Sequence, residues 1–361
     1  MKNNYCVIMA GGIGSRFWPM SRNNFPKQFI DILGNGKTLI RQTYERFSEL
    51  CPKENIFIVT NEAYLDHVFK QIPELTKNQV LAEPQRRNTA PCIAYAAMKI
   101  HSLNPDANLI IAPSDHVITN EQKFNEAIIK GLDFTAKNPS LLTIGIHPSR
   151  PDTGYGYIQF NDDDRIEEFK ISKVKTFTEK PNLEMAKFFL KSGEFLWNAG
   201  IFLWTSKSIL KAFEESMPDM YQLFNDGKDL YNTPEENDFI KGTYTQCKNI
   251  SIDYGIMEKA KNVFVLSAEF GWSDLGTWKS LYEELPHDEK GNAIVGPHVM
   301  VDNTSNCIIN MPKNKLAVIQ GLENFIVVET ENVLLICPKE DEQQVRNLVN
   351  DVKLKKGEKY V

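Results

Sequence analysis

The stretch Met9-Ala10-Gly11-Gly12-Ile13-Gly14-Ser15-Arg16 decides the fold, because its glycines follow directly on a short apolar run. That run, Tyr5–Met9, has the composition of a buried strand. Glycine accepts positive φ and has no Cβ that would keep backbone N–H groups away from a ligand. Successive N–H groups in such a turn can bind phosphate oxygens. The sequence therefore predicts a phosphate-binding turn at the end of a strand, formed by Ala10, Gly11, Gly12, Gly14 and Ser15.

Two basic residues distinguish this turn from an ordinary one. Arg16 closes the turn and Lys27 follows it, with prolines stiffening the segment between them. Both charges are placed to neutralise a polyphosphate. A dinucleotide-binding fingerprint is excluded because it needs a small residue at the position of Phe17. A Walker phosphate-binding motif is excluded because its first glycine would have to stand at the position of Asp31.

The segment from Met9 to Phe29 resembles the signature of the sugar-1-phosphate nucleotidylyltransferase family. Within it, Trp18-Pro-Met-Ser-Arg22 and Pro26-Lys-Gln-Phe29 are similar to the mannose-1-phosphate guanylyltransferase branch. The resemblance implies that the loop holds a nucleoside triphosphate. It also implies that Arg16 and Lys27 are catalytic residues that bind its phosphates.

The composition is that of an ordinary globular protein. The 361 residues are 42% hydrophobic and 24% charged, enough for one large domain and a smaller one. A formal net charge of −6 argues against a nucleic-acid partner. No apolar run approaches the roughly 18 residues that span a membrane. We therefore expect a cytoplasmic protein without a membrane partner, whose six scattered cysteines are reduced core residues.

From residue 5 to about residue 280, apolar runs alternate with amphipathic segments. The predicted strands include Asn55–Thr60, Asn108–Ala112, Leu141–Ile146 and Val263–Leu266, and the predicted helices include Thr38–Leu50, Thr89–Ser102 and Glu121–Thr135. This alternation predicts an α/β fold with a Rossmann-like, mostly parallel mixed sheet flanked by helices. Ligands then bind at the carboxyl ends of the strands. We expect this catalytic domain to span residues 1–285.

The character of the chain changes from about Asn292. Short apolar runs separated by turn residues predict a small β domain resembling a partial β-helix over residues 290–361. A charged helical tail, Lys339–Val361, closes it. Longer members of the resembled family continue into an isomerase domain. Because this sequence has no room for such a domain, we expect no isomerase activity. The extra β domain makes a homodimer plausible.

A second strand end carries Glu83-Pro84-Gln85-Arg86-Arg87-Asn88-Thr89 and opens a helix. Asn88 or Thr89 can cap this helix. The stretch also resembles the family motif that lies near the nucleotide base. The Glu83 carboxylate could accept hydrogen bonds from guanine N1–H and its exocyclic amine. We therefore assign Glu83, Asn88 and Thr89 to nucleotide binding, with Glu83 and Asn88 reading the base.

Two aspartates follow strand-like runs at distant positions. Asp115 lies in Pro113-Ser114-Asp115-His116, and Asp274 lies in the glycine-bounded turn Gly271–Trp278. Hard carboxylate oxygens suit Mg²⁺. The resemblance implies that both aspartates are catalytic and bind Mg²⁺; their pairing rests on the resemblance and not on spacing.

Three segments that combine aromatic and polar residues have the composition of a sugar pocket. They are Thr153–Ile158, Phe177–Pro181 and Phe195–Trp204. Ordinary core packing of their rings is the alternative. The resemblance implies that the sugar phosphate is bound by Gly156, Glu179, Lys180 and Asn198.

Two further stretches have weaker signals. Residues 216–248 are polar and rich in helix breakers, which predicts a helical excursion on the surface. The stretch Ser251–Lys259 is expected to open a helix and to have a structural or supporting role at the active site.

Taken together, the resemblance implies transfer of GMP from GTP to mannose 1-phosphate, giving pyrophosphate and GDP-mannose, a polysaccharide precursor. A uridylyl- or thymidylyltransferase acting on glucose 1-phosphate is the main alternative. Other aldose 1-phosphates, including fucose and heptose derivatives, also stay open. A non-catalytic sugar-nucleotide sensor would be expected to lose at least one of four residues that are all present: Arg16, Lys27, Asp115 and Asp274.

Overall fold

The computed structural model describes residues 2–166 and 168–361, which form two compact units. Unit 1 contains the residues up to Gly11, Thr43–Ser114 and Ile118–Trp272. Unit 2 contains Gly12–Gln42, Asp115–Val117 and Ser273–Val361. The segment that follows the first glycine of the turn therefore groups with the C-terminal residues, a grouping that a linear division near residue 285 does not express.

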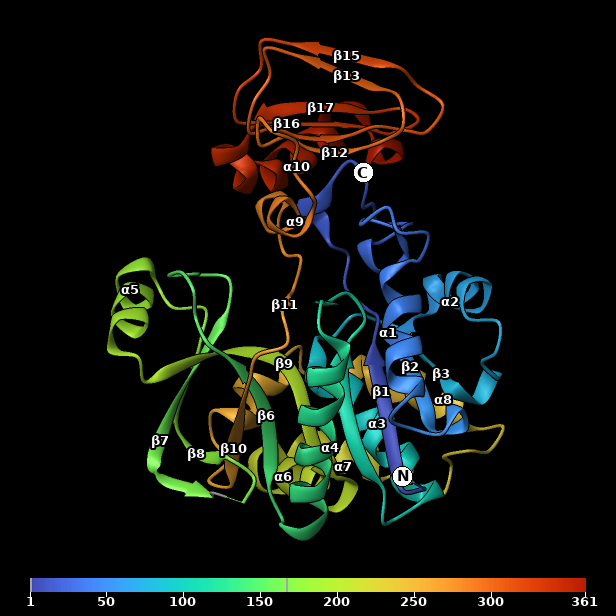
Figure 1. Ribbon diagram of the computed structural model, residues 1–361. Coiled ribbons are helices and arrows are strands. Elements are labelled where there is room, and N and C mark those ends of the chain that lie inside the picture. Colours follow the sequence, from blue (N-terminus) through green and yellow to red (C-terminus); the bar gives the residue numbers. More distant parts are fainter. Residues whose placement is uncertain (1, 167) are drawn as a thin grey trace. The chain divides into compact units, whose positions relative to one another are not determined.

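Unit 1 is built on a nine-stranded sheet with the strand order β3-β2-β1-β4-β9-β6-β10-β8-β7 (Figure 1). The first four strands of this order are parallel, and β10 is parallel to β6. β9 runs antiparallel between β4 and β6, and β8 and β7 are antiparallel to their neighbours. The strands are β1 (Asn4–Met9), β2 (Ile56–Asn61), β3 (Val80–Glu83), β4 (Asn108–Pro113), β6 (Leu141–Ile146), β7 (Gly156–Ile166), β8 (Ile171–Glu179), β9 (Phe195–Thr205) and β10 (Val263–Ala268).

Helices cover both faces of this sheet, as the residues of β4 demonstrate. Leu109 and Ile111 belong to one core cluster with the apolar residues of α3. Asn108, on the other face, donates to the Leu132 carbonyl and accepts from the Thr135 hydroxyl, both in α4. The helices up to residue 246 are α1 (Leu39–Ser48), α2 (Leu65–Gln71), α3 (Thr89–Leu103), α4 (Glu121–Lys137), α5 (Leu183–Ser192), α6 (Ser206–Ser216), α7 (Pro218–Asn225) and α8 (Glu236–Gln246). The Rossmann-like α/β fold expected from the sequence is confirmed.

The stretch 216–248 differs from its expected place on the surface. Its helices α7 and α8 pack on unit 1 and contribute Phe224, Ile240 and Tyr244 to the main core cluster. Phe224 and Tyr244 are fully buried. The expectation of a helical surface excursion holds in part: the stretch is helical and many of its polar residues are exposed, but a few apolar residues at helical spacing bury one face.

Unit 2 combines the segment after the glycine-rich turn with the C-terminal strands. Its core cluster joins Phe17 and Trp18 to Trp278 and to strand residues such as Ile308 and Ile326. One sheet has the order β12-β14-β16-β17 and a second pairs β13 with β15, with parallel pairing everywhere except between β16 and β17. The elements are α9 (Trp278–Glu284), β12 (Ala293–Val295), β13 (Val299–Asp302), β14 (Ile308–Asn310), β15 (Ala317–Gln320), β16 (Phe325–Glu329), β17 (Leu334–Pro338) and α10 (Val345–Lys356). The small β-helix-like domain with a helical tail is thus confirmed.

Two short strands lie where the chain passes between the units: β5 (Val117–Ile118) and β11 (Trp272–Ser273). Over residues 2–166 and 168–361, no helix is both long enough and apolar enough to cross a membrane. The six cysteines all lie in this described part, and each is buried with an unpaired thiol.

The core of unit 2 gives a stability prediction. Ile326→Ala removes a fully buried side chain from this core and should lower the free energy of unfolding by about 2–5 kcal/mol. Val318→Ala, on an exposed face of the same unit, should change it by less than about 0.5 kcal/mol. Urea unfolding measures both, and equal losses in the two variants would contradict this packing.

Candidate functional site

The glycine-rich turn is fixed at both ends by hydrogen bonds and packing. In unit 1, the Ala10 N–H donates to the Val59 carbonyl at 2.8 Å, and the Ala10 carbonyl accepts from the Thr60 hydroxyl at 2.9 Å. In unit 2, Gly14 has φ 63°, and a Cβ on it would lie 2.7 Å from the Cβ of Lys27. Only glycine fits there, because a side chain would meet both strain and a clash.

The tryptophan and arginine of the signature bind the C-terminal part of unit 2. Trp18 Nε1 donates to the Tyr360 carbonyl at 2.6 Å. Arg22 Nη2 donates to Thr330 Oγ1 at 2.9 Å and to Asn332 Oδ1 at 2.6 Å. These residues therefore anchor the loop that carries Arg16, which explains why a local signature needs them.

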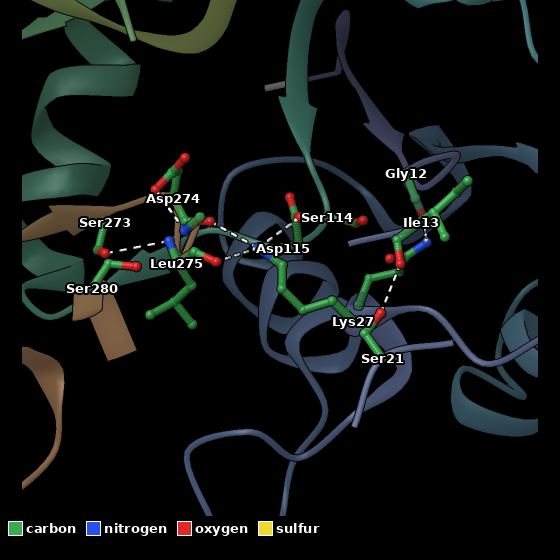
Figure 2. A network of polar contacts seen from close by, with 12 residues as sticks. Gly12, Ile13, Ser21, Lys27, Ser114, Asp115, Ser273, Asp274, Leu275 and Ser280 are labelled. Carbon is green, nitrogen blue, oxygen red and sulfur yellow. Dashed lines mark hydrogen bonds and ion pairs between the residues drawn. The ribbon is translucent and has the colours of Figure 1, made fainter. Parts of the chain in front are cut away.

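Lys27 connects the three segments of unit 2 (Figure 2). The residue is only 3% exposed. Its Nζ lies 2.9 Å from Asp115 Oδ2 and donates to the carbonyls of Asp274 at 2.8 Å and Leu275 at 2.9 Å. An ammonium has three N–H donors, so these three contacts use all of them. Hydrogen bonds from a charged donor are the strong class, and they hold both aspartate segments against the loop.

Each of the two aspartates has a carboxylate oxygen that is held by the protein. Burial acts to raise the pKa of Asp115, but the charges of Lys27 and His116 outweigh it, and the pKa is lowered overall. Asp115 is therefore a carboxylate at neutral pH. Asp274 Oδ1 accepts from the Gly276 N–H at 2.8 Å, in a turn where Leu275 has φ 43°.

A cavity of about 240 Å³ in unit 2 gathers the residues assigned to phosphate and metal binding. Gly14, Ser15, Arg16, Lys27, Asp115 and Asp274 all line it. Gly12 lies in the same unit, and its carbonyl accepts from Gln28 Nε2 at 3.1 Å. Segments from three distant parts of the sequence thus form one polar site that combines two cationic and two acidic side chains.

In unit 1, Glu83 lies beside the start of the glycine-rich turn. A Cβ on Gly11 would be 3.3 Å from Glu83 Oε2, while Glu83 Oε1 accepts from the Tyr244 hydroxyl at 3.0 Å. Burial raises the pKa of Glu83 to about 7, and hydrogen bonding by Tyr244 and the charge of Arg86 only partly oppose this. Glu83 is thus poised between its neutral and charged forms near pH 7.

Asn88 and Thr89 form the start of α3. Asn88 is exposed with φ 66°, and its side chain accepts from the Thr89 N–H at 2.9 Å. The Thr89 hydroxyl accepts from the Ile252 N–H at 2.9 Å, which ties this helix start to the segment before Asp253. Asn88 therefore caps the helix, one of the two caps that the local sequence offers, whereas Thr89 is the first helical residue and makes a long-range contact.

The residues assigned to the sugar phosphate meet at the edge of unit 1. Gly156 and Glu179 are opposite each other in the β7–β8 pairing, and a Cβ on Gly156 would overlap Glu179 Oε2. Lys180 has φ 48°, and its Nζ lies 2.5 Å from Glu179 Oε1. Lys180 is more than half exposed whereas Glu179 is nearly buried, so the lysine charge stays available to an anion.

Asn198 is held by three hydrogen bonds within unit 1. Its Oδ1 accepts from the Thr143 hydroxyl at 3.0 Å and from the Gly200 N–H at 3.1 Å. Its Nδ2 donates to Asp253 Oδ1 at 3.0 Å. Burial, followed by the nearby Glu179 charge, raises the pKa of Asp253 to about 6. Asp253 therefore belongs to the same polar group as Asn198 and Glu179.

The structure differs from the sequence expectation at Asp253 and at the aromatic residues. Residues Asp253–Met257 form a single π-helical turn and not the start of an α-helix. Trp197 is only 4% exposed and packs edge to face on Tyr155, so its ring is core and not a sugar platform. The sequence motif around Asp253 indicates a supporting role for this segment. No local sequence pattern identifies Asn198 as the hydrogen-bond partner of Asp253.

Comparison with known proteins places these features in context. The sequence matches the family profile described as "Nucleotidyl transferase" over residues 5–291 and the profile "MannoseP isomerase/GMP-like beta-helix domain" over residues 296–352.

Individual relatives cover nearly the whole chain. A mannose-1-phosphate guanylyltransferase of Klebsiella pneumoniae is 35% identical over 98% of this chain and 75% of its own length. The alginate biosynthesis protein AlgA of Pseudomonas aeruginosa is 35% identical over 96% of this chain and 71% of its own length. The solved structure of a Thermus thermophilus protein described as mannose-1-phosphate geranyltransferase has a TM-score of 0.85 at 27% identity, covering 97% of this chain and 99% of that chain.

Two glycines of the turn give a stability prediction, because their surroundings and backbone conformations differ. Gly14→Ala places a Cβ against Lys27 in left-handed backbone and should lower the free energy of unfolding by about 1–3 kcal/mol. Gly12→Ala meets no atom within 4 Å and should leave stability nearly unchanged. Urea unfolding of the two variants tests this, and an equal effect would show that Gly14 is not conformationally required.

Proposed function

This chain belongs to the nucleotidyl transferase family, and from that premise we propose that it transfers GMP from GTP to mannose 1-phosphate, with release of pyrophosphate. The names of relatives about 35% identical over nearly the full chain support this pair of substrates. The structural observation that carries the proposal is the unit 2 cavity, where Arg16, Lys27 and two aspartates meet the glycine-rich turn.

The proposed reaction is an in-line displacement at phosphorus. A phosphate oxygen of mannose 1-phosphate attacks the α-phosphorus of GTP, the bond from that phosphorus to the bridging oxygen breaks, and pyrophosphate leaves. A phosphate monoester has a second pKa of about 6, so the nucleophile is already a dianion at neutral pH. No general base is required, and the chain's task is to position two anions and to neutralise their charge.

Arg16 and Lys27 are the residues we assign to that neutralisation. Arg16 lines the cavity and presents a permanent charge to the triphosphate. Lys27 has its three N–H groups in use within unit 2, so its contribution starts as a buried charge that orders the loop and both aspartate segments. Contact between Lys27 and a phosphate oxygen would exchange one of these bonds for another charge-assisted bond.

The donor atoms at Asp115 and Asp274 fit Mg²⁺. Enzymes hold this ion through one or two carboxylates and complete its shell with substrate phosphates and water. Among the described residues, no group of three or more His, Cys, Asp or Glu side chains could hold a metal by itself, so a site completed by substrate is the arrangement that fits. We propose that Asp115 and Asp274 hold Mg²⁺, which when bound supplies positive charge to the reacting phosphates.

The residues in unit 1 supply recognition in this proposal. Glu83, next to the glycine-rich turn, accepts hydrogen bonds from the guanine edge, and Asn88 assists it. Glu179 and Asn198 contact sugar hydroxyls, and Lys180 pairs with the phosphate of the sugar. The buried reduced cysteines are typical of a reducing compartment, so we propose that the reaction takes place in the cytoplasm.

Pyrophosphate release tests the proposed function. The purified protein is assayed with Mg²⁺ while GTP, UTP, dTTP and ATP are crossed with mannose, glucose and fucose 1-phosphates. Release confined to GTP with mannose 1-phosphate is expected. Release with another pair would reassign the recognition residues, and no release with any pair would overturn the proposal.

Two substitutions in the cavity should reduce turnover. Lys27→Ala and Asp274→Asn each remove a charge from the reacting phosphates or from their Mg²⁺, and we expect kcat to fall by about 10²-fold or more. Asp302→Asn, an exposed carboxylate of the same unit, serves as the control. Steady-state kinetics measures the effect, and the thermal unfolding midpoint reports whether each variant is folded. A near wild-type rate in a folded Lys27 or Asp274 variant would remove that residue from the mechanism.

Base recognition should depend on pH. The pKa of Glu83 is about 7 in the free protein, and donors on guanine favour its carboxylate form. The affinity for GTP should therefore be highest above pH 7. It should fall as the pH drops through 7, by up to about tenfold per pH unit. KM for GTP, measured between pH 6 and 8, checks this. Glu83→Gln keeps the titration of the substrates but removes that of the carboxyl, so an identical profile in this variant would refute the assignment.

A further inference from the structure

Tyr244 makes a buried hydrogen bond to Glu83 and has no role in the reaction steps proposed above. It is on α8, within the stretch 216–248, and its side chain is fully buried. Its hydroxyl donates to Glu83 Oε1 at 3.0 Å across a sequence separation of 161 residues. A buried hydroxyl that is hydrogen-bonded to a buried carboxyl group favours one orientation of that group.

The other oxygen of Glu83 points toward the glycine-rich turn. Oε2 would lie 3.3 Å from a Cβ built on Gly11, and within the described residues it accepts no hydrogen bond. Asn61 Nδ2 donates to the main-chain carbonyl of Glu83 at 3.0 Å, which fixes the backbone at this position. The backbone and Oε1 are thus held by the protein, whereas Oε2 remains for a ligand at the turn.

We propose that Tyr244 is a positioning residue for base specificity, which orients the Glu83 carboxylate toward the hydrogen-bond donors of guanine. This inference rests on the proposed function, because it assumes that a guanine nucleotide is bound beside Gly11. Tyr244 itself does not touch the substrate and acts only through Glu83.

The packing of Tyr244 allows its hydroxyl to be tested alone. Its ring contacts Phe224 edge to face, with ring centroids 6.0 Å apart. Tyr244→Phe keeps this ring contact and removes only the hydrogen bond. Tyr231→Phe is a matched control, because its buried hydroxyl donates to the Phe224 carbonyl at 2.9 Å and has no contact with Glu83.

The electrostatic surroundings of Glu83 set the sign of the expected pH effect. Hydrogen bonding by Tyr244 and the charge of Arg86 both lower the pKa of Glu83, against the larger effect of burial. Cys92 on α3 also faces Glu83, and Cys247 lies near Tyr244, but burial raises the pKa of both thiols, so they stay neutral near pH 7. Loss of the Tyr244 hydroxyl therefore raises the pKa of Glu83 further.

The first experiment compares GTP with ITP, which keeps the N1–H of the base but lacks the exocyclic amine. For Tyr244→Phe we expect KM for GTP to rise about tenfold with kcat nearly unchanged, and the preference for GTP over ITP in kcat/KM to shrink by a similar factor. The pH at which KM for GTP begins to rise should move upward. Tyr231→Phe should match the wild type in all three measurements.

A double-mutant cycle distinguishes positioning from a general structural effect. In a Glu83→Gln background, Tyr244→Phe should change KM for GTP by less than about twofold, since the residue acts through the carboxylate. A tenfold further loss there, or unchanged KM and GTP preference in the Tyr244→Phe single variant, would overturn the inference. Failure of the wild type to use GTP with mannose 1-phosphate would instead overturn the proposed function, so the two failures are distinguishable.

Discussion

The ammonium of Lys27 is the constraint on which the cavity of unit 2 depends. It is buried, and its three donors hold Asp115 and the carbonyls of Asp274 and Leu275. A buried charge is tolerated only when it is paired and fully hydrogen-bonded, so the loop and both aspartate segments must adopt this one arrangement. These three contacts hold the segments that carry both carboxylates of the cavity. The neighbour of Lys27 in space, Gly14, has to be glycine because its φ is positive and a Cβ would meet the Cβ of that lysine.

The polar groups that we propose for recognition in unit 1 are built on buried carboxyl groups in place of a buried cation. Glu83 and Asp253 both have raised pKa values because burial disfavours their charged forms. Each carboxyl group accepts a hydrogen bond from a neutral donor, Glu83 from Tyr244 and Asp253 from Asn198, and this bond opposes the rise in pKa. The Thr89–Ile252 hydrogen bond connects the two groups through the start of α3. The residues that we propose for base and sugar recognition are therefore joined by contacts within unit 1.

Much of the fold and of the candidate site could be predicted from the sequence, because these features depend on local sequence patterns. Apolar runs ending in glycine or aspartate predict strands with ligands at their carboxyl ends, and α1, α3 and α4 lie within two residues of their predicted bounds. Contacts between distant segments leave no such pattern. The anchoring of Trp18 by Tyr360, the partnership of Tyr244 with Glu83 and the π-helical turn at Asp253 all depend on tertiary packing. Average polarity misled for the same reason at residues 216–248, where a few buried side chains determine the position of the helices.

Transfer of label from GTP labelled at the α-phosphorus tests the central claim, that this site joins a nucleotidyl group to a sugar phosphate. The protein is incubated with labelled GTP, mannose 1-phosphate and Mg²⁺, and the products are separated. We predict that all of the transferred label appears in GDP-mannose and that the released pyrophosphate is unlabelled, because the bond that breaks lies between the α-phosphorus and the bridging oxygen. Label in free GMP, in pyrophosphate or only in unreacted GTP would contradict it.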